Sequence, residues 1–222
     1  HDDDGALRNA IRAGDVELVR QLIGEGCPLG NGFTPLHVAA ETGHVELCRI
    51  LIEAGANVQA WTPGHLGRWT PLHVVGGVNA AEVCQLLLAN GADLNARSRP
   101  DGFCPLHEFV TQVVRGNLHL DVVEVLLHSG ADPNSRTVNE KTPMRVALDE
   151  CRARLEVPLQ DEEASQATVD EIIGRSEAVL TLLFHRGGDA NAVDNGNFSL
   201  IGALLNHMRI TITGLNATRL YA

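Results

Sequence analysis

The chain of 222 residues has a formal net charge of -11, with 44% hydrophobic and 20% charged residues. This composition is typical of a folded globular protein and excludes a disordered chain, and no apolar run reaches the roughly 18 residues of a transmembrane helix. The negative charge disfavours nucleic acid as a partner, because phosphate binding requires a basic surface.

The N-terminus and the cysteines bear on the compartment. The first ten residues, HDDDGALRNA, are too acidic and polar for a secretory signal. The cysteines are odd in number and form no C-x-x-C pair, so we expect them to be reduced core residues and not a disulfide framework. We also expect no membrane partner, because no apolar run is long enough for a transmembrane helix. A cytoplasmic location follows as our expectation, with the nucleus as the alternative. The five cysteines are Cys27, Cys48, Cys84, Cys104 and Cys151.

Along the chain, one phrase of about 34 to 38 residues returns several times. Its opening, T-P-L-H or a variant, starts at positions 34, 70, 104 and 142. Each proline suits the first turn of a helix, and the threonine before it can cap that turn, although Cys104 is a poor cap. The run from Val45 to Ile52 has the apolar period of a second helix. A glycine closes each copy, at Gly55, Gly91, Gly130 and Gly187.

These phrases resemble ankyrin repeats, whose pattern is T-P-L-H, A-A, G-H, an L-L run and G-A-D-x-N-A. The resemblance implies an all-α repeat solenoid, in which helix-turn-helix units are joined by β-hairpin fingers and stack into one continuous core. We expect the repeat domain to span residues 1–206 and the C-terminal extension, 207–222, to have a different fold. The expected units are an N-terminal cap at 5–29, repeats at about 30–60, 61–96, 97–135 and 136–192, with an insertion at 152–171, and a half-repeat at 193–206.

Three histidines recur at the same place in successive copies, namely His37, His73 and His107. Units stacked roughly 10 Å apart would hold them too far apart to share one tetrahedral zinc ion. The resemblance instead implies joints, in which each imidazole hydrogen-bonds backbone and ties one unit to the next. In the fourth copy Arg145 replaces the histidine, which a shared metal site would not tolerate. Patterns typical of a nucleophile, an acid-base pair or a phosphate loop are absent, so we expect no metal, no cofactor and no enzyme.

Aromatic residues gather in the segments between the units. Phe33, Trp69 and Phe103 stand directly before the repeated phrase, and Trp61 opens the segment WTPGHLGRW. Because aromatic side chains dominate binding hot spots and fingers face solvent or a partner, these residues are candidate anchors. The alternative is that Trp61 and Trp69 only pack on each other and stabilise their loop.

Small, polar or acidic residues are expected to line the first helices beside these anchors. Such a groove would accept an extended segment that carries apolar anchors and positive charge, with Glu41, Asp149 and Glu150 supplying negative potential. The candidate partner-binding residues are Phe33, Glu41, Thr42, Trp61, Trp69, Val78, Phe103, Gln112, Asp149 and Glu150.

We therefore interpret the chain as a monomeric protein-interaction module, an adaptor or substrate-recognition scaffold. Its expected partner is a protein or peptide that is basic, or mixed apolar and basic. Alternatives are a substrate receptor of a ubiquitin ligase, a host-mimicking effector, and a reader of lysine-containing or methylated tails in which two tryptophans cage the cation. An inert spacer and a metal enzyme at the histidine row are further classes that the sequence leaves open.

Overall fold

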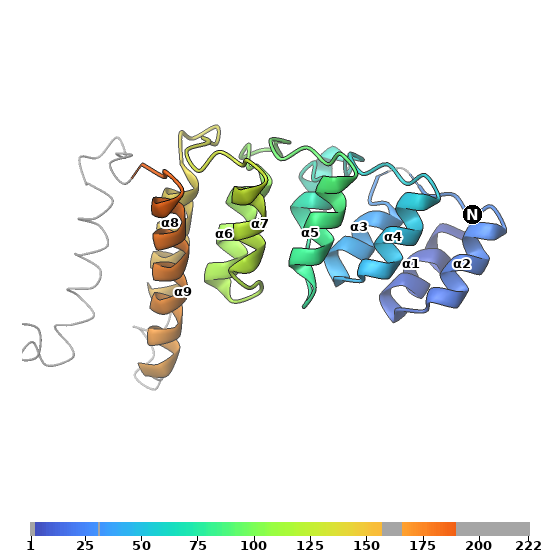
Figure 1. Ribbon diagram of the computed structural model, residues 1–222, viewed down its shortest axis with the longest axis horizontal. Coiled ribbons are helices and arrows are strands. Elements are labelled where there is room, and N and C mark those ends of the chain that lie inside the picture. Colours follow the sequence, from blue (N-terminus) through green and yellow to red (C-terminus); the bar gives the residue numbers. More distant parts are fainter. Residues whose placement is uncertain (1–2, 31, 157–165, 190–222) are drawn as a thin grey trace, which may run out of the picture.

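The computed structural model describes residues 3–30, 32–156 and 166–189, which form one row of stacked helix pairs (Figure 1). All helices and turns of these residues belong to an all-α repeat fold, which confirms the expected fold class. No helix in this part of the chain is both long enough and apolar enough to cross a membrane. The elements are α1 (Asp3–Ala13), α2 (Val16–Gly24), α3 (Pro35–Thr42), α4 (Val45–Glu53), η1 (Gly64–Leu66), η2 (Pro71–Val74), α5 (Ala80–Ala89), α6 (Pro105–Arg115), α7 (Asp121–His128), α8 (Pro143–Glu156) and α9 (Gln166–His185).

The repeated phrase sets where the first helices begin. In α3, Pro35 occupies the first turn, and the Thr34 hydroxyl accepts a hydrogen bond from the His37 amide at 3.4 Å. The helix ends at Gly43, whose φ of 75° is a left-handed conformation that favours glycine. Proline also begins η2, α6 and α8, as the sequence predicts.

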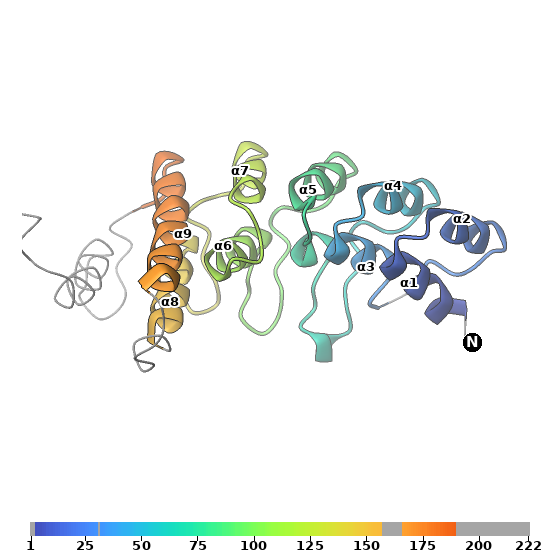
Figure 2. The ribbon, with the colours of Figure 1, turned by 90° about the horizontal axis from the view of Figure 1, so that it is seen from below.

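One apolar core runs through the stack. First and second helices both contribute to it, and the side chains of Leu36, Leu72 and Leu106 have no exposed surface. Burying a leucine contributes about 1.5 to 3 kcal/mol, so no unit could retain this stabilisation without its neighbours. Figure 2 shows the first helices along one side of the row and the second helices along the other.

Four of the five cysteines are buried thiols in this core, whereas Cys27 is partly buried and packs against it. Burial raises the pKa of Cys48 and of Cys84 to about 12, so both stay protonated at neutral pH. Cys104 differs because it stands where other units have threonine. Its Sγ lies 3.0 Å from Nδ1 of His107 and 3.4 Å from Oγ of Ser135.

The fingers are hairpin-shaped loops without a β-ladder in the described residues. Short backbone hydrogen bonds close them, for example from the Thr62 amide to the Trp69 carbonyl at 2.8 Å and from the Ser98 amide to the Phe103 carbonyl at 2.9 Å. Neighbouring fingers are also joined, since the Arg99 amide donates to the Gly67 carbonyl at 2.8 Å. The expected hairpins are thus present in outline, but each is too short to extend the pairing.

The expected insertion lengthens both helices of its unit. The helix α8 has 14 residues and α9 has 20, so both ends of the expected insertion 152–171 are helical. The helix α9 is thus longer than the second helices α4, α5 and α7, which have 9, 10 and 8 residues. The middle of the insertion, the half-repeat 193–206 and the extension 207–222 lie outside the described residues.

Candidate functional site

The recurring histidines are joints between units. In each, Nδ1 accepts a hydrogen bond from the backbone amide three residues earlier, at 3.2 Å in His37 and His73 and at 3.3 Å in His107. A neutral imidazole that accepts at Nδ1 carries its proton on Nε2 and donates from there. The acceptors in the next unit are the carbonyl oxygens of Trp69, Phe103 and Lys141, at 3.1, 3.1 and 3.2 Å. The predicted joint is confirmed in three successive units.

Burial keeps two of these imidazoles neutral. His37 exposes none of its surface and His73 exposes 3%. Burial lowers the pKa of each to about 4, although the hydrogen bonds to backbone act in the opposite direction. At neutral pH neither ring contributes positive charge to the face of the stack. Within residues 3–30, 32–156 and 166–189, no group of three or more His, Cys, Asp or Glu could hold a metal ion.

The second unit lacks most of its first helix. The first helices α3, α6 and α8 have 8, 11 and 14 residues, whereas η2 is a 3-10 turn of 4 residues. After Val75, the residues Gly76 and Gly77 press against the end of α3. A Cβ added to Gly76 would lie 2.5 Å from the Glu41 carbonyl oxygen, and one added to Gly77 would lie 2.6 Å from that of Thr42. Only glycine permits this approach, and Gly77 also has a φ of 74°.

A hollow of about 390 Å³ lies where the missing turns would be, which is a volume typical of ligand pockets. We call it the notch. It is lined by Glu41 of α3, by Trp69 of the preceding finger and by Gln112 of α6, three of the candidate residues. Figure 2 shows the short segment η2 between α3 and α6, which explains how side chains from separate units reach the same hollow.

Sequence reasoning missed one acidic residue of the notch, Glu108, and the amide of Asn117 that supports it through Gln112. Nδ2 of Asn117 donates to Oε1 of Gln112 at 2.7 Å, and Nε2 of Gln112 donates to Oε1 of Glu108 at 2.7 Å. This relay holds the Glu108 carboxylate at the wall of the notch. Among the described residues neither Glu41 nor Glu108 forms a salt bridge. The i,i+4 spacing of Glu108 and Gln112 was the signal that could have revealed the pair.

Trp69 is held in place by its backbone. Its amide donates to the Thr62 hydroxyl at 2.8 Å, and its carbonyl accepts from the Thr62 amide at 2.8 Å and from His37 Nε2 at 3.1 Å. The side chain is nevertheless 38% exposed and borders the notch. Because the backbone of Trp69 is anchored, the point from which its ring projects is set before a ligand arrives, which reduces the ordering cost of binding.

Trp61 lies in the same finger but takes different contacts. Its ring centroid is 6.2 Å from that of His73, and the Arg68 guanidinium carbon lies 5.1 Å from the centroid of the Trp61 ring. The ring contacts of the described residues include none between Trp61 and Trp69, so the structure does not support the alternative that the two rings pack on each other. Because a cation of the chain itself already lies over Trp61, a cage for a foreign ammonium group formed by the two tryptophans is not preformed.

Phe33 and Phe103 are half-buried against the joints. The ring centroid of Phe33 is 5.3 Å from that of His37, and the centroid of Phe103 is 5.5 Å from that of His107. Both phenylalanines pack against the core cluster. Part of the aromatic row therefore stabilises the stack, and Trp69 is its most accessible member at the notch.

Thr42 and Val78 flank the notch without lining it. The Thr42 hydroxyl donates to the Val38 carbonyl at 2.8 Å within α3, so its hydrogen-bonding capacity is used internally. Val78 follows the glycine pair and is 87% exposed, a large apolar exposure for its size. It offers an apolar contact beside the hollow.

Asp149 and Glu150 do not supply free negative charge. Asp149 bonds the Lys141 ammonium at 2.7 Å and the Arg145 guanidinium at 2.9 Å, and Glu150 binds Arg115 at 2.8 and 3.0 Å. The pKa of Arg115 is raised, chiefly by the hydrogen bond that it donates to Glu150. Both carboxylates line a second hollow of about 310 Å³ with Phe103, but their charge is compensated within the chain, contrary to the expectation.

Comparison with known proteins identifies the repeats. The family model described as ankyrin repeats, in three copies, matches residues 7–98 and 61–137. "Ankyrin repeat and SOCS box protein 3" from Bos taurus is 30% identical over 139 residues, which are 61% of this chain and 19% of that protein. "Ankyrin repeat, SAM and basic leucine zipper domain-containing protein 1" from Notamacropus eugenii is 40% identical over 58 residues, 24% of this chain and 12% of that protein.

A third relative carries an enzyme's name. "2-5A-dependent ribonuclease" from Mus musculus is 38% identical over 61 residues, which are 25% of this chain and 8% of that protein. The matches thus span between 8% and 19% of the length of these three relatives. The family model covers more than half of the 222 residues, and its span includes the histidine joints and the notch. The chain belongs to the ankyrin-repeat family.

Proposed function

We propose that this chain is an adaptor or substrate-recognition scaffold that binds a partner protein at the notch and the first-helix face around it. Ankyrin repeats are protein-interaction modules, and at the notch this chain departs from a regular stack. The observation that carries the proposal is the combination of a hollow on the first-helix side with a rigidly held, exposed Trp69. We propose no catalytic role for the chain.

Preorganisation supports this proposal. Association costs free energy for every side chain that must be ordered, and this cost is reduced when the binding groups are already fixed. Trp69 is fixed by its backbone bonds and Glu108 by the amide relay. A regular first helix in the second unit would fill the same space. Its absence leaves that space open to a side chain of the partner.

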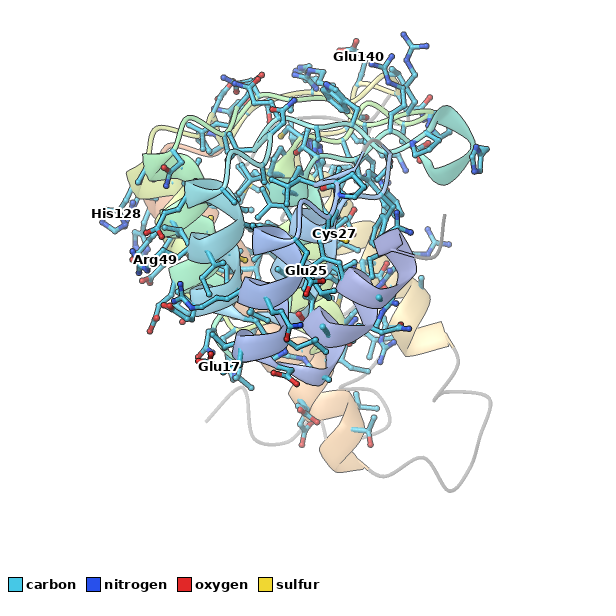
Figure 3. All side chains as sticks on the ribbon, turned by 90° about the vertical axis from the view of Figure 1, so that its right-hand side faces the viewer. Glu17, Glu25, Cys27, Arg49, His128 and Glu140 are labelled. Atoms are coloured by element: carbon cyan, nitrogen blue, oxygen red, sulfur yellow. The ribbon has the colours of Figure 1, made fainter. Side chains whose placement is uncertain are left out.

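The test is affinity capture from cell lysate with three baits. These are the wild type, a notch variant with Trp69→Ala and Gln112→Ala, and the control Arg49→Ala on α4. Arg49 lies on the outer side of the stack together with His128, away from the finger end where Glu140 is found (Figure 3). Captured proteins should fall about tenfold or more with the notch variant and stay unchanged with the control. Equal recovery by all three folded baits, with folding checked by circular dichroism, would contradict the proposal.

A substrate receptor of a ubiquitin ligase remains the second candidate. It is favoured by one observation, the match to a relative named for a SOCS box as well as for ankyrin repeats, but that match spans 19% of the relative. Recovery of ligase subunits with both the wild type and the notch variant would favour this candidate. The host-mimicking effector and the tail reader have no such support. The cytoplasmic or nuclear location and the monomeric state stay predictions.

A further inference from the structure

We infer that the notch is an arginine-binding site, which accepts the guanidinium of an extended peptide segment between Glu41, Glu108 and Trp69. This inference deepens the proposed function and rests on it, because it names the chemistry of the partner. The three groups come from three separate elements, α3, α6 and the finger before η2, and they meet only because the second unit lacks its helix.

Charge is the first argument. Both carboxylates line the notch and neither is in a salt bridge within the described part of the chain, whereas Asp149 and Glu150 in the second hollow are each paired. The remaining titratable lining residue, His73, is a buried joint whose Nε2 already donates to a carbonyl. No lysine or arginine lines the notch, although Arg115 on α6 is close enough to interact with the charge of Glu108. A positively charged group is therefore the ligand that complements Glu41 and Glu108.

Shape and geometry favour arginine over lysine. A guanidinium is planar, stacks on aromatic faces and donates in a fixed fork that suits carboxylates on two sides, whereas an ammonium is a compact, strongly hydrated charge. Trp69 supplies an exposed ring beside the carboxylates. The relay from Asn117 through Gln112 uses only one oxygen of Glu108, Oε1, in the hydrogen bonds described. Oε2 remains as an acceptor for the ligand.

We infer that the occupant is a peptide segment because the exposed Val78 lies beside the acidic notch. Val78, which is 87% exposed, follows the glycine pair that borders the notch. An arginine in the notch would bring its neighbouring residue in an extended chain over this valine. The preferred segment therefore carries an arginine next to an apolar residue, which matches the overall charge of -11.

The experiment measures fluorescence anisotropy with labelled pools of short peptides that differ only in one fixed central residue. The central residue is arginine, lysine, leucine, glutamate or citrulline, the neutral isostere of arginine, and the flanking positions are randomised. The arginine pool should bind about tenfold more tightly than the citrulline pool, and more tightly than the lysine pool. Equal binding of the arginine and citrulline pools would overturn the inference, and equal binding of arginine and lysine would overturn the choice of arginine.

Variants of the chain complete the test. Glu41→Gln and Glu108→Gln should each lower the affinity for the arginine pool about three- to tenfold. The control is Glu17→Gln on α2, an exposed glutamate at the N-terminal end of the stack (Figure 3), which should leave this affinity unchanged. A double variant with Glu41→Arg and Glu108→Arg should instead prefer the glutamate pool. Retained arginine preference in this folded double variant would refute the site.

This assay separates the two proposals. If lysate capture depends on Trp69 and Gln112 but the pools show no preference for arginine, the interaction module stands and the arginine site falls. If capture is independent of the notch and the pools show no preference, both fail.

Discussion

The histidine joints make stability depend on pH in a defined window. The pKa of His37 and of His73 is lowered from 6.5 to about 4 by burial, so the unfolded chain binds more protons than the folded chain between these values. Stability therefore rises with pH across this window, is complete above about pH 6.5 and falls as the solution is acidified toward pH 4. Acidification from about pH 7.5 to pH 5 should therefore lower the unfolding free energy by about 2 kcal/mol for each histidine, or about 4 kcal/mol for the pair.

The perturbation that isolates one joint is His73→Gln. It should lower the stability at neutral pH, because the bond to the Phe103 carbonyl is weakened, and it should halve the drop in stability between about pH 7.5 and pH 5 to about 2 kcal/mol. Urea unfolding followed by circular dichroism at both pH values measures the difference. His119→Gln serves as the control for removing an exposed imidazole. A drop in the His73→Gln variant as large as that of the wild type would refute the assignment of the pH dependence to this joint.

Three further variants test the packing. Gly77→Ala should cost about 1 to 3 kcal/mol more than Gly91→Ala in urea unfolding, since both glycines have positive φ but only at Gly77 would a Cβ meet backbone, at 2.6 Å. Cys104→Thr should raise the unfolding free energy by about 1 kcal/mol, because a hydroxyl bonds the His107 ring better than a thiol does. Asp149→Ala should cost about 1 kcal/mol, and the loss should shrink in 1 M salt as its two ion pairs are screened.

Most of the stack could be predicted because its determinants are local. Three features act within one turn: a threonine or cysteine cap, the proline after it, and a histidine three residues after the cap. Together they place the start of a unit without knowledge of the rest of the chain. The same histidine also predicts the joint, since its second nitrogen reaches the following unit in every regular copy, as His37, His73 and His107 do.

The notch could not be predicted with the same rules. The glycine pair at Gly76 and Gly77 indicates a weak helix, because each glycine costs about 1 kcal/mol in a helix interior. It does not show that the backbone would instead press onto the end of α3, nor that Glu108 would be turned toward the opening by Gln112. Those outcomes depend on contacts between three units, which a pattern within one unit does not contain.

Charge illustrates the same limit at the level of single residues. The acidic positions Glu41, Asp149 and Glu150 look alike in the sequence, yet two of them are bound by cations that neighbouring turns and units bring to them. The single lysine of the chain, Lys141, is one of these cations. The net charge therefore says little about where a basic partner binds, because paired carboxylates attract it weakly. We therefore expect a basic partner to be attracted most strongly at the notch, where a first helix is missing and no lysine or arginine lines the hollow.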